Sequence, residues 1–174
     1  MIDWPLETFQ AMRKAKVGVV GYVPDAGHQR LIELCHSERN LRAVVLSTEE
    51  EGIGLAAGAW LGGVRSALLM QSSGVGNCVN ALGMVRECRF PLLMIVTMRG
   101  EEGEFNPWQV PMGLGTPAVL AALGVIVHRA DAAAEVGPAV AKAAQLAYGG
   151  PAAVAVLVSQ PVIGIKSFQE QASQ

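Results

Sequence analysis

The sequence that decides the fold is Ser47-Thr48-Glu49-Glu50-Glu51-Gly52-Ile53-Gly54-Leu55-Ala56-Ala57-Gly58, followed after a short interval by Gln71-Ser72-Ser73-Gly74-Val75-Gly76-Asn77. In the first segment three carboxylates open a helical pattern that carries few bulky side chains. In the second segment an apolar run of strand length ends in a polar, glycine-rich turn. Polar turns after buried strands are typical of α/β proteins, which bind ligands beyond the carboxyl ends of their strands.

Apolar runs of strand length alternate with helical patterns along the chain. We expect strands at 17–23, 43–46, 67–70, 91–97, 125–128 and 152–158. We expect helices at 6–16, 28–37, 49–62, 75–88, 116–123 and 132–148, with a long loop at 98–115. Continuously apolar strands indicate a sheet covered on both faces, and the helices between them indicate parallel crossovers. The sequence therefore predicts a single domain over 1–174, a three-layer α/β/α fold with a six-stranded parallel sheet and a weakly structured C-terminal tail at 160–174.

The composition narrows the class of protein. The chain is 51% hydrophobic and only 16% charged, whereas the surface of a monomer carries roughly 25–35% charged side chains. We therefore expect other subunits to cover part of the surface. A net charge of −2 provides no basic field for a nucleic acid. No signal peptide or membrane span is visible, which predicts a cytoplasmic protein, and we expect its three cysteines to be buried, reduced thiols.

The acidic helix start has a structural and a functional interpretation. Thr48 as N-cap and Glu51 at the third helical position form a capping box, and carboxylates in a first turn complement the helix dipole. Three acids nevertheless exceed what capping requires. The glycines that follow each cost about 1 kcal/mol in a helix interior, which the close approach of a backbone or a ligand can offset. The helix is apolar on all sides, so we expect it to be buried.

The spacing from Glu49 to Gly58 resembles the pyrimidine-binding (Pyr) domain of thiamine diphosphate enzymes, in particular the sulfopyruvate and phosphonopyruvate decarboxylases. The resemblance implies a thiamine diphosphate-binding fold of Pyr type, with Glu49 as the catalytic carboxyl, Glu50 as a weaker candidate and Glu51 as the capping partner. In that family the glutamate hydrogen-bonds N1′ of the aminopyrimidine. It thereby favours the imino tautomer, whose nitrogen removes the thiazolium C2 proton, a form of general acid–base catalysis.

Two polar turns extend the resemblance. The segment 71–77 resembles the family's Gln-Asn-Ser-Gly-Leu-Gly-Asn. Its structural alternative is a strand-to-helix turn with Gly74 or Gly76 at positive φ and Ser73 as the cap. A dinucleotide fingerprint or P-loop does not fit, because the third glycine and the lysine are missing. The segment 21–25 resembles the family's Gly-Val-Pro-Asp turn, although turn preferences also explain its composition. The cofactor contacts that the resemblance implies are Glu49, Gln71, Ser72, Ser73, Gly74, Asn77 and Pro24.

The remaining candidates face the substrate. The resemblance implies that Asp25, the second catalytic candidate, assists proton transfer. Arg99, at a strand end, can pair with a carboxylate or sulfonate in a bidentate contact, or equally form a salt bridge with Glu101 or Glu102. Gln109 lies in the same loop, which also resembles the subfamily. His28 stands where the family usually has a small residue, which leaves the substrate open. The substrate contacts that we expect are therefore Arg99, His28 and Gln109.

Half of a thiamine diphosphate site is missing from the chain. The family holds the diphosphate through Mg²⁺ with a Gly-Asp-Gly turn and a downstream asparagine, and none of the three aspartates has glycine on both sides. We therefore expect no metal ligand here, and a PP-domain β subunit that carries the Gly-Asp-Gly…Asn motif and Mg²⁺. The predicted function is the α subunit of a two-subunit decarboxylase that converts sulfopyruvate to sulfoacetaldehyde and CO₂. The alternatives are a decarboxylase or carboligase for phosphonopyruvate or another 2-oxo acid, and a non-catalytic ligand-binding module.

Overall fold

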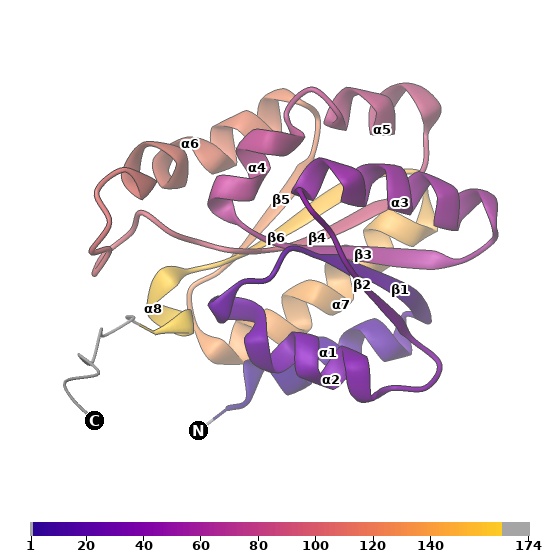
Figure 1. Ribbon diagram of the computed structural model, residues 1–174, viewed down its shortest axis with the longest axis horizontal. Coiled ribbons are helices and arrows are strands. Elements are labelled where there is room, and N and C mark those ends of the chain that lie inside the picture. The colour runs from indigo at the N-terminus through magenta and orange to yellow at the C-terminus, as the bar shows by residue number, and fades with distance from the viewer. Residues whose placement is uncertain (1, 165–174) are drawn as a thin grey trace.

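The computed structural model describes residues 2–164, in which strands and helices alternate (Figure 1). The strands are β1 (Val17–Tyr22), β2 (Arg42–Val45), β3 (Arg65–Gln71), β4 (Leu92–Thr97), β5 (Ile126–Ala130) and β6 (Ala153–Val158). The helices are α1 (Trp4–Lys14), α2 (Gln29–Ser37), α3 (Glu49–Leu61), α4 (Ser72–Cys78), α5 (Leu82–Cys88), α6 (Gln109–Ala122), α7 (Ala133–Gly149) and α8 (Gln160–Ile163). A 3₁₀ turn, η1 (Ala26–His28), precedes α2.

The sheet has the predicted parallel arrangement. Its six strands lie in the order β2-β1-β3-β4-β6-β5, and each neighbouring pair is parallel. After β1 the chain goes to β2 on one side and returns to β3 on the other. The strand order therefore reverses next to β1, and in such sheets ligands bind beyond the carboxyl ends of the strands at this point. The loops after β1 and β3 flank that crevice.

Helices cover both faces of the sheet and create two apolar cores. Helices α1, α2 and α7 lie on one face, and α3, α4, α5 and α6 lie on the other (Figure 1). Alternate residues of a strand point to opposite faces. Leu69 and Leu93 accordingly belong to the first core, whereas Leu68 and Met94 belong to the second. The three-layer prediction is thus confirmed, and the two cores hold the strand ends in place.

Helix α6 begins earlier than the sequence predicted. It starts at Gln109 rather than 116, so the expected loop at 98–115 is shorter. Pro111 is tolerated because the N–H groups of a first turn have no partner within the helix. A Cβ at Gly113 would lie 2.0 Å from the backbone oxygen of Arg99. The bare glycine lets this helix pack directly on the end of β4, and that tertiary contact outweighs the low helix propensity of its residues.

The predicted helix at 75–88 is two helices, α4 and α5. Helix α4 begins at Ser72, so the polar turn forms its first turns, and Gln71 occupies the N-cap position. Neither Gly74 nor Gly76 has a positive φ. The structural alternative with a positive-φ glycine and Ser73 as cap is therefore wrong. Position 74 requires glycine because the side chain of Glu49 packs directly against it.

Helix α3 is buried on one face only. Its buried residues are Glu49, Gly52, Ile53 and Ala56, and a Cβ at Gly52 would lie 2.3 Å from the side chain of Leu68. Gly54 and Gly58 instead face open space. The expectation of a helix buried on all sides is wrong for this chain, because its outer apolar face has no neighbour among residues 2–164.

The ends of the chain differ slightly from the predictions. Helix α1 begins at Trp4, where Asp3 accepts a hydrogen bond from the backbone N–H of Leu6 at 3.3 Å. The first residues of the predicted tail form the short helix α8, and the tail from residue 165 onward lies outside the described residues. No helix in residues 2–164 has the length and apolar character that crossing a bilayer requires.

Candidate active site at the carboxyl edge of the sheet

The predicted site residues gather where β1, β3 and β4 end. Asp25 follows β1, Gln71 is the last residue of β3, and Arg99 follows β4. The parallel register places Gln71 directly beside Thr97. Glu49 joins them as the first residue of α3, which follows β2 and packs against α4. The fold therefore brings together the polar turns that the sequence places far apart.

The carboxyl group of Glu49 is held by groups from two helices. The residue is only 6% exposed. Asn77 donates a hydrogen bond from Nδ2 to Oε2 of Glu49 at 2.7 Å. Gly74 lies beneath the same carboxyl, because a Cβ there would come within 2.3 Å of Oε1 and 2.4 Å of Cδ. Within residues 2–164, Oε1 has no hydrogen-bond partner. One oxygen is thus anchored and the other is available to a ligand.

The three adjacent acids have different environments. Glu51 accepts a hydrogen bond from the backbone N–H of Ser47 at 2.8 Å and so caps the helix start. Thr48 occupies the N-cap position without a side-chain capping bond, and Glu51 bonds Ser47 rather than the N-cap residue, so the predicted capping box does not form. Glu50 is exposed. Helix capping therefore explains the position of Glu51 but does not explain why Glu49 is buried.

Asp25 lies on the neighbouring turn, against the end of β4. Thr97 donates a hydrogen bond from Oγ1 to Oδ2 of Asp25 at 2.8 Å. Nearby, the side-chain oxygen of Gln71 is buried without a hydrogen-bond partner in the described chain. Asp25, Thr97 and Arg99 help to line a cavity of about 20 Å³, which is space for about one water molecule. The site has carboxylates and an unpaired amide oxygen, but a substrate has to bind outside this small cavity.

Arg99 is paired with Glu104, a partner that the sequence did not indicate. Nε and NH2 of Arg99 each donate to a different oxygen of Glu104, both at 2.7 Å. The two side chains are 14% and 1% exposed. The hydrogen bonds from Arg99 contribute most to lowering the pKa of Glu104 to about 2. The salt-bridge alternative is thus correct in kind, but its partner is neither Glu101 nor Glu102.

His28 lies in the interior of the fold. Its Nε2 donates toward the backbone oxygens of Met70 and Ile95 at 3.2 and 3.1 Å, and the residue has no exposed surface. Burial lowers the pKa of the imidazole. A substrate would find no part of His28 to touch, so this position does not support the predicted substrate contact. The histidine instead links the ends of β3 and β4 to the turn that carries Asp25.

The other predicted residues lie at the same edge in different roles. Ser72 is fully buried, and its Oγ accepts a hydrogen bond from the backbone N–H of Arg99 at 3.0 Å. Pro24 is exposed, and Ser73 is half-buried in the first turn of α4. Gln109 is half-buried, and its backbone oxygen would lie 2.4 Å from a Cβ at Gly100. Residues 2–164 contain no group of three or more His, Cys, Asp and Glu residues that could hold a metal ion.

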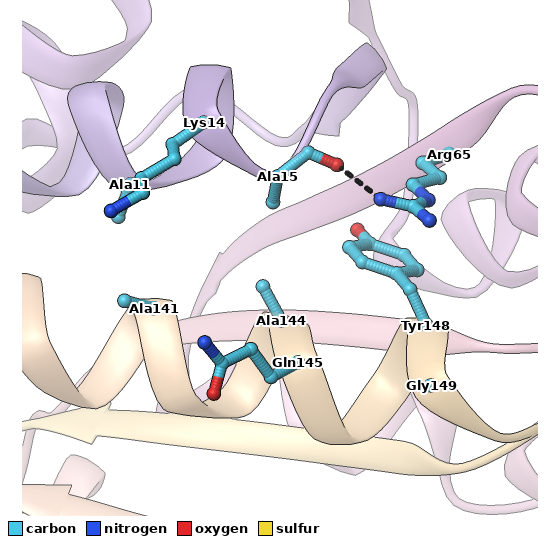
Figure 2. A pocket seen from close by; sticks show the side chains of 9 residues that line it. All are labelled: Ala11, Lys14, Ala15, Arg65, Ala141, Ala144, Gln145, Tyr148 and Gly149. Carbon is cyan, nitrogen blue, oxygen red and sulfur yellow. Dashed lines mark hydrogen bonds between the residues drawn. The ribbon is translucent and has the colours of Figure 1, made fainter.

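A larger hollow lies at the opposite edge of the sheet. It has a volume of about 380 Å³ between α1, α7 and the start of β3 (Figure 2). Arg65 donates from NH1 to the backbone oxygen of Ala15 at 2.8 Å, and its guanidinium lies 5.1 Å from the ring centre of Tyr148. Through Arg65, these contacts link the C-terminal end of α1 to α7. Because Arg65 begins β3, this hollow is separated from Glu49 by the length of the strands.

Comparison with known proteins places the chain in a family. It is 34% identical over 158 residues to the sulfopyruvate decarboxylase subunit alpha of Methanothermobacter thermautotrophicus, covering 90% of this chain and 96% of that subunit. It is 37% identical over 113 residues to the subunit of the same name in Methanococcus maripaludis, covering 64% of this chain and 68% of the relative. No protein-family model matches the chain.

A solved structure shares the fold. A 2-oxoglutarate:ferredoxin oxidoreductase from Magnetococcus marinus superposes with a TM-score of 0.69 at 15% identity, covering 99% of this chain and 34% of the other. This likeness concerns the fold alone. The identity to the Methanothermobacter subunit extends over nearly the whole chain and confirms the resemblance that its motifs indicate. The chain therefore belongs to the family of sulfopyruvate decarboxylase alpha subunits.

Proposed function

We propose that the chain supplies the pyrimidine side of a thiamine diphosphate site in a decarboxylase that converts sulfopyruvate to sulfoacetaldehyde and CO₂. Glu49 is the group that hydrogen-bonds the aminopyrimidine. The observation that carries the proposal is the state of this carboxyl, which is buried, anchored through one oxygen and open at the other. An acid that acts in general acid–base catalysis has to be held in this way within hydrogen-bond reach of its partner.

The surroundings of Glu49 fit the cofactor's ring. Gly74 lets the carboxyl of Glu49 pack directly against α4, because a Cβ at position 74 would collide with that carboxyl. The buried side-chain oxygen of Gln71 lacks a donor in the described chain. A ring that carries an amino group would supply such a donor. Ser73 and Asn77 on α4 and the exposed Pro24 lie at the same edge and complete the proposed cradle. When bound, thiamine diphosphate supplies an electron sink for the bond that breaks in decarboxylation.

Asp25 is the second acid–base group in this proposal. Decarboxylation of sulfopyruvate would break the bond between its carboxylate carbon and its keto carbon and release CO₂. A proton then has to reach the former keto carbon before the aldehyde is released. Asp25 is held in place by Thr97 and is half-buried at the strand edge. That position supports a role in delivering the proton.

The chain needs a partner to complete this site. Its relatives are named as alpha subunits, which implies an assembly of different subunits. Residues 2–164 offer no cluster of metal ligands, so we assign the Mg²⁺ and the diphosphate to a β subunit with a Gly-Asp-Gly…Asn motif. The carboxyl edge around Glu49 is where that subunit has to approach.

Reconstitution tests the function. The chain is coexpressed with a β-type subunit, and CO₂ release is measured with sulfopyruvate, phosphonopyruvate and benzoylformate. We expect turnover of sulfopyruvate. Preference for another 2-oxo acid would favour the alternative decarboxylases, and an assembly without cofactor binding would favour a ligand-binding module.

The role of Glu49 is tested separately by Glu49→Gln, with the exposed neighbour Glu50→Gln as the matched control. We expect Glu49→Gln to assemble but to lose the exchange of the cofactor's C2 proton in deuterated buffer, measured by NMR. The control keeps that exchange. A wild-type exchange rate in Glu49→Gln would refute the role.

A further inference from the structure

We propose that Arg99 and Glu104 form a positioning pair that shapes the wall of the site beside Asp25, and that the cation that meets the substrate's sulfonate comes from the partner subunit. The inference rests on the proposed function. It says which subunit recognises the sulfonate of the substrate. It replaces the direct contact between Arg99 and the substrate that the sequence suggested.

The first observation is the set of contacts around Glu104. Besides the two bonds from Arg99, its carboxylate accepts hydrogen bonds from the backbone N–H groups of Gly100 and Asn106 at 3.0 and 2.9 Å. It also accepts one from Nε2 of Gln160 at 3.1 Å. Five donors therefore converge on one carboxylate whose side chain is 1% exposed. This carboxylate organises the loop from Arg99 to Asn106.

A second carboxylate ties the same loop to the neighbouring strand ends. Glu101 accepts a hydrogen bond from NH1 of Arg129 at 2.7 Å and from the backbone N–H of Gln160 at 2.9 Å. The backbone N–H of Glu101 donates to Oε1 of Gln160 at 2.9 Å. The loop is thus fixed to α8 and to the end of β5, and the Arg99–Glu104 pair is part of a continuous polar network.

This network forms the wall that faces Asp25. Asp25, Thr97, Arg99 and Gln160 line the same small cavity. The backbone of Arg99 is held by Ser72 on α4, and its guanidinium lies 5.6 Å from the ring centre of Phe105. A change in the pair therefore alters the geometry next to the proposed proton donor.

The charges at the carboxyl edge explain why another cation is needed. Among residues 2–164, three arginines lie at this edge, and each binds a carboxylate of the same chain: Arg30 with Asp3, Arg99 with Glu104, and Arg129 with Glu101 and Asp131. The remaining lysines and arginines of residues 2–164 lie on α1, α5 and α7, or at or shortly before the start of a strand.

Asp25 and Glu49 have no salt-bridge partner among the described residues. A substrate with a carboxylate and a sulfonate would approach these carboxyl groups, and every arginine of the described chain at this edge is already paired with a carboxylate. The partner subunit has to provide the cation. Recruiting Arg99 instead would leave the buried charge of Glu104 without its partner, which is strongly unfavourable.

The test compares two substrates in the assembled complex. Sulfopyruvate carries the sulfonate and pyruvate lacks it, so a sulfonate receptor affects only the first. We expect Arg99→Gln and Glu104→Gln to lower kcat about tenfold or more for both substrates, with the ratio of their KM values unchanged. Glu102→Gln, an exposed position in the same loop, serves as the control and keeps wild-type kinetics.

Arg99→Lys separates the two roles further. Lysine keeps the charge but lacks the planar fork that binds both oxygens of Glu104. We expect Arg99→Lys to behave like Arg99→Gln. The proposal is overturned if Arg99→Gln raises the KM for sulfopyruvate tenfold or more, leaves pyruvate unaffected and is rescued by lysine.

The isolated chain provides an independent measurement. We expect a double-mutant cycle of thermal unfolding to show strong coupling between Arg99→Gln and Glu104→Gln. Additive losses of stability would contradict the positioning pair. A wild-type complex that does not decarboxylate sulfopyruvate would count against the proposed function, while this cycle would still decide whether the two residues act as a pair.

Discussion

The carboxyl group of Glu49 packs directly against Gly74, so closely that a Cβ would not fit at position 74. A methyl group at position 74 would lie 2.3 Å from Oε1 of the carboxyl. The glycine of α4 and the glutamate of α3 therefore depend on each other, although 24 positions of sequence separate them. A single added carbon provides a sensitive probe of this relationship.

We predict that Gly74→Ala abolishes most of the activity while the fold persists. The new methyl group displaces the carboxyl, and a misplacement of about 1 Å costs about a hundredfold in rate. The matched control is Gly76→Ala in the same helix, where a Cβ would lie 3.5 Å from the sulfur of Met112, an ordinary contact. Steady-state kinetics of the reconstituted complex and thermal unfolding of both variants check the prediction. Equal activity in the two variants would contradict it.

Asn77 provides a second probe of the same carboxyl. Its Nδ2 donates to Oε2 of Glu49 at 2.7 Å, and a hydrogen bond to a charged group contributes about 1.5–3 kcal/mol. We expect Asn77→Ala to lower kcat about tenfold. We expect Asn77→Asp to be worse, because it places a second carboxylate against the first. If Asn77→Asp retained more activity than Asn77→Ala, the amide would not be the anchor.

The buried imidazole of His28 predicts a dependence of stability on pH. Its pKa in the fold is below the ordinary value of 6.5, chiefly because burial disfavours the charged form. As the pH falls below 6.5, the unfolded chain binds a proton that the folded chain resists, so the free energy of unfolding decreases. We expect His28→Gln to show a flatter decrease between pH 6.5 and 5 in urea unfolding experiments. Parallel curves for the two proteins would show that His28 does not titrate as the fold requires.

The three thiols should react differently. Cys35 and Cys78 are buried and Cys88 is exposed, which corrects the expectation that all three are buried. Burial raises the pKa of both buried thiols to about 12. At pH 8 a maleimide should therefore add once to the native chain and three times after denaturation, as measured by intact mass. Cys88→Ser should remove the native adduct. Rapid labelling of Cys78 in the native chain would mean that the contact between α3 and α4 opens readily.

Local patterns in the sequence predicted the sheet well. Both faces of a strand such as β4 are buried, so all of its residues can be apolar and composition alone predicts the strand. The resemblance to Pyr domains made Glu49 the catalytic candidate, and the structure shows that Glu51 is the acid that caps the helix. These features depend on residues that are near each other in the chain.

The features that the sequence did not reveal depend on tertiary contacts. The early start of α6 results from the approach of Gly113 to the backbone of Arg99. Glu104 was missed because its donors come from Arg99 just after β4, from its own loop and from α8. His28 was predicted to contact the substrate because it departs from the family pattern, and only the packing of η1 beneath β3 and β4 shows that it is buried.

The carboxyl of Glu49, its amide anchor and its glycine neighbour all belong to residues 49–77. This arrangement has an evolutionary consequence. Gene fusion, gene splitting or circular permutation with a breakpoint outside that stretch would transfer the proposed catalytic acid together with its immediate supports as one unit. The geometry around Glu49 would therefore survive such rearrangements, whereas Asp25 and the wall formed by Arg99 and Glu104 lie outside this stretch.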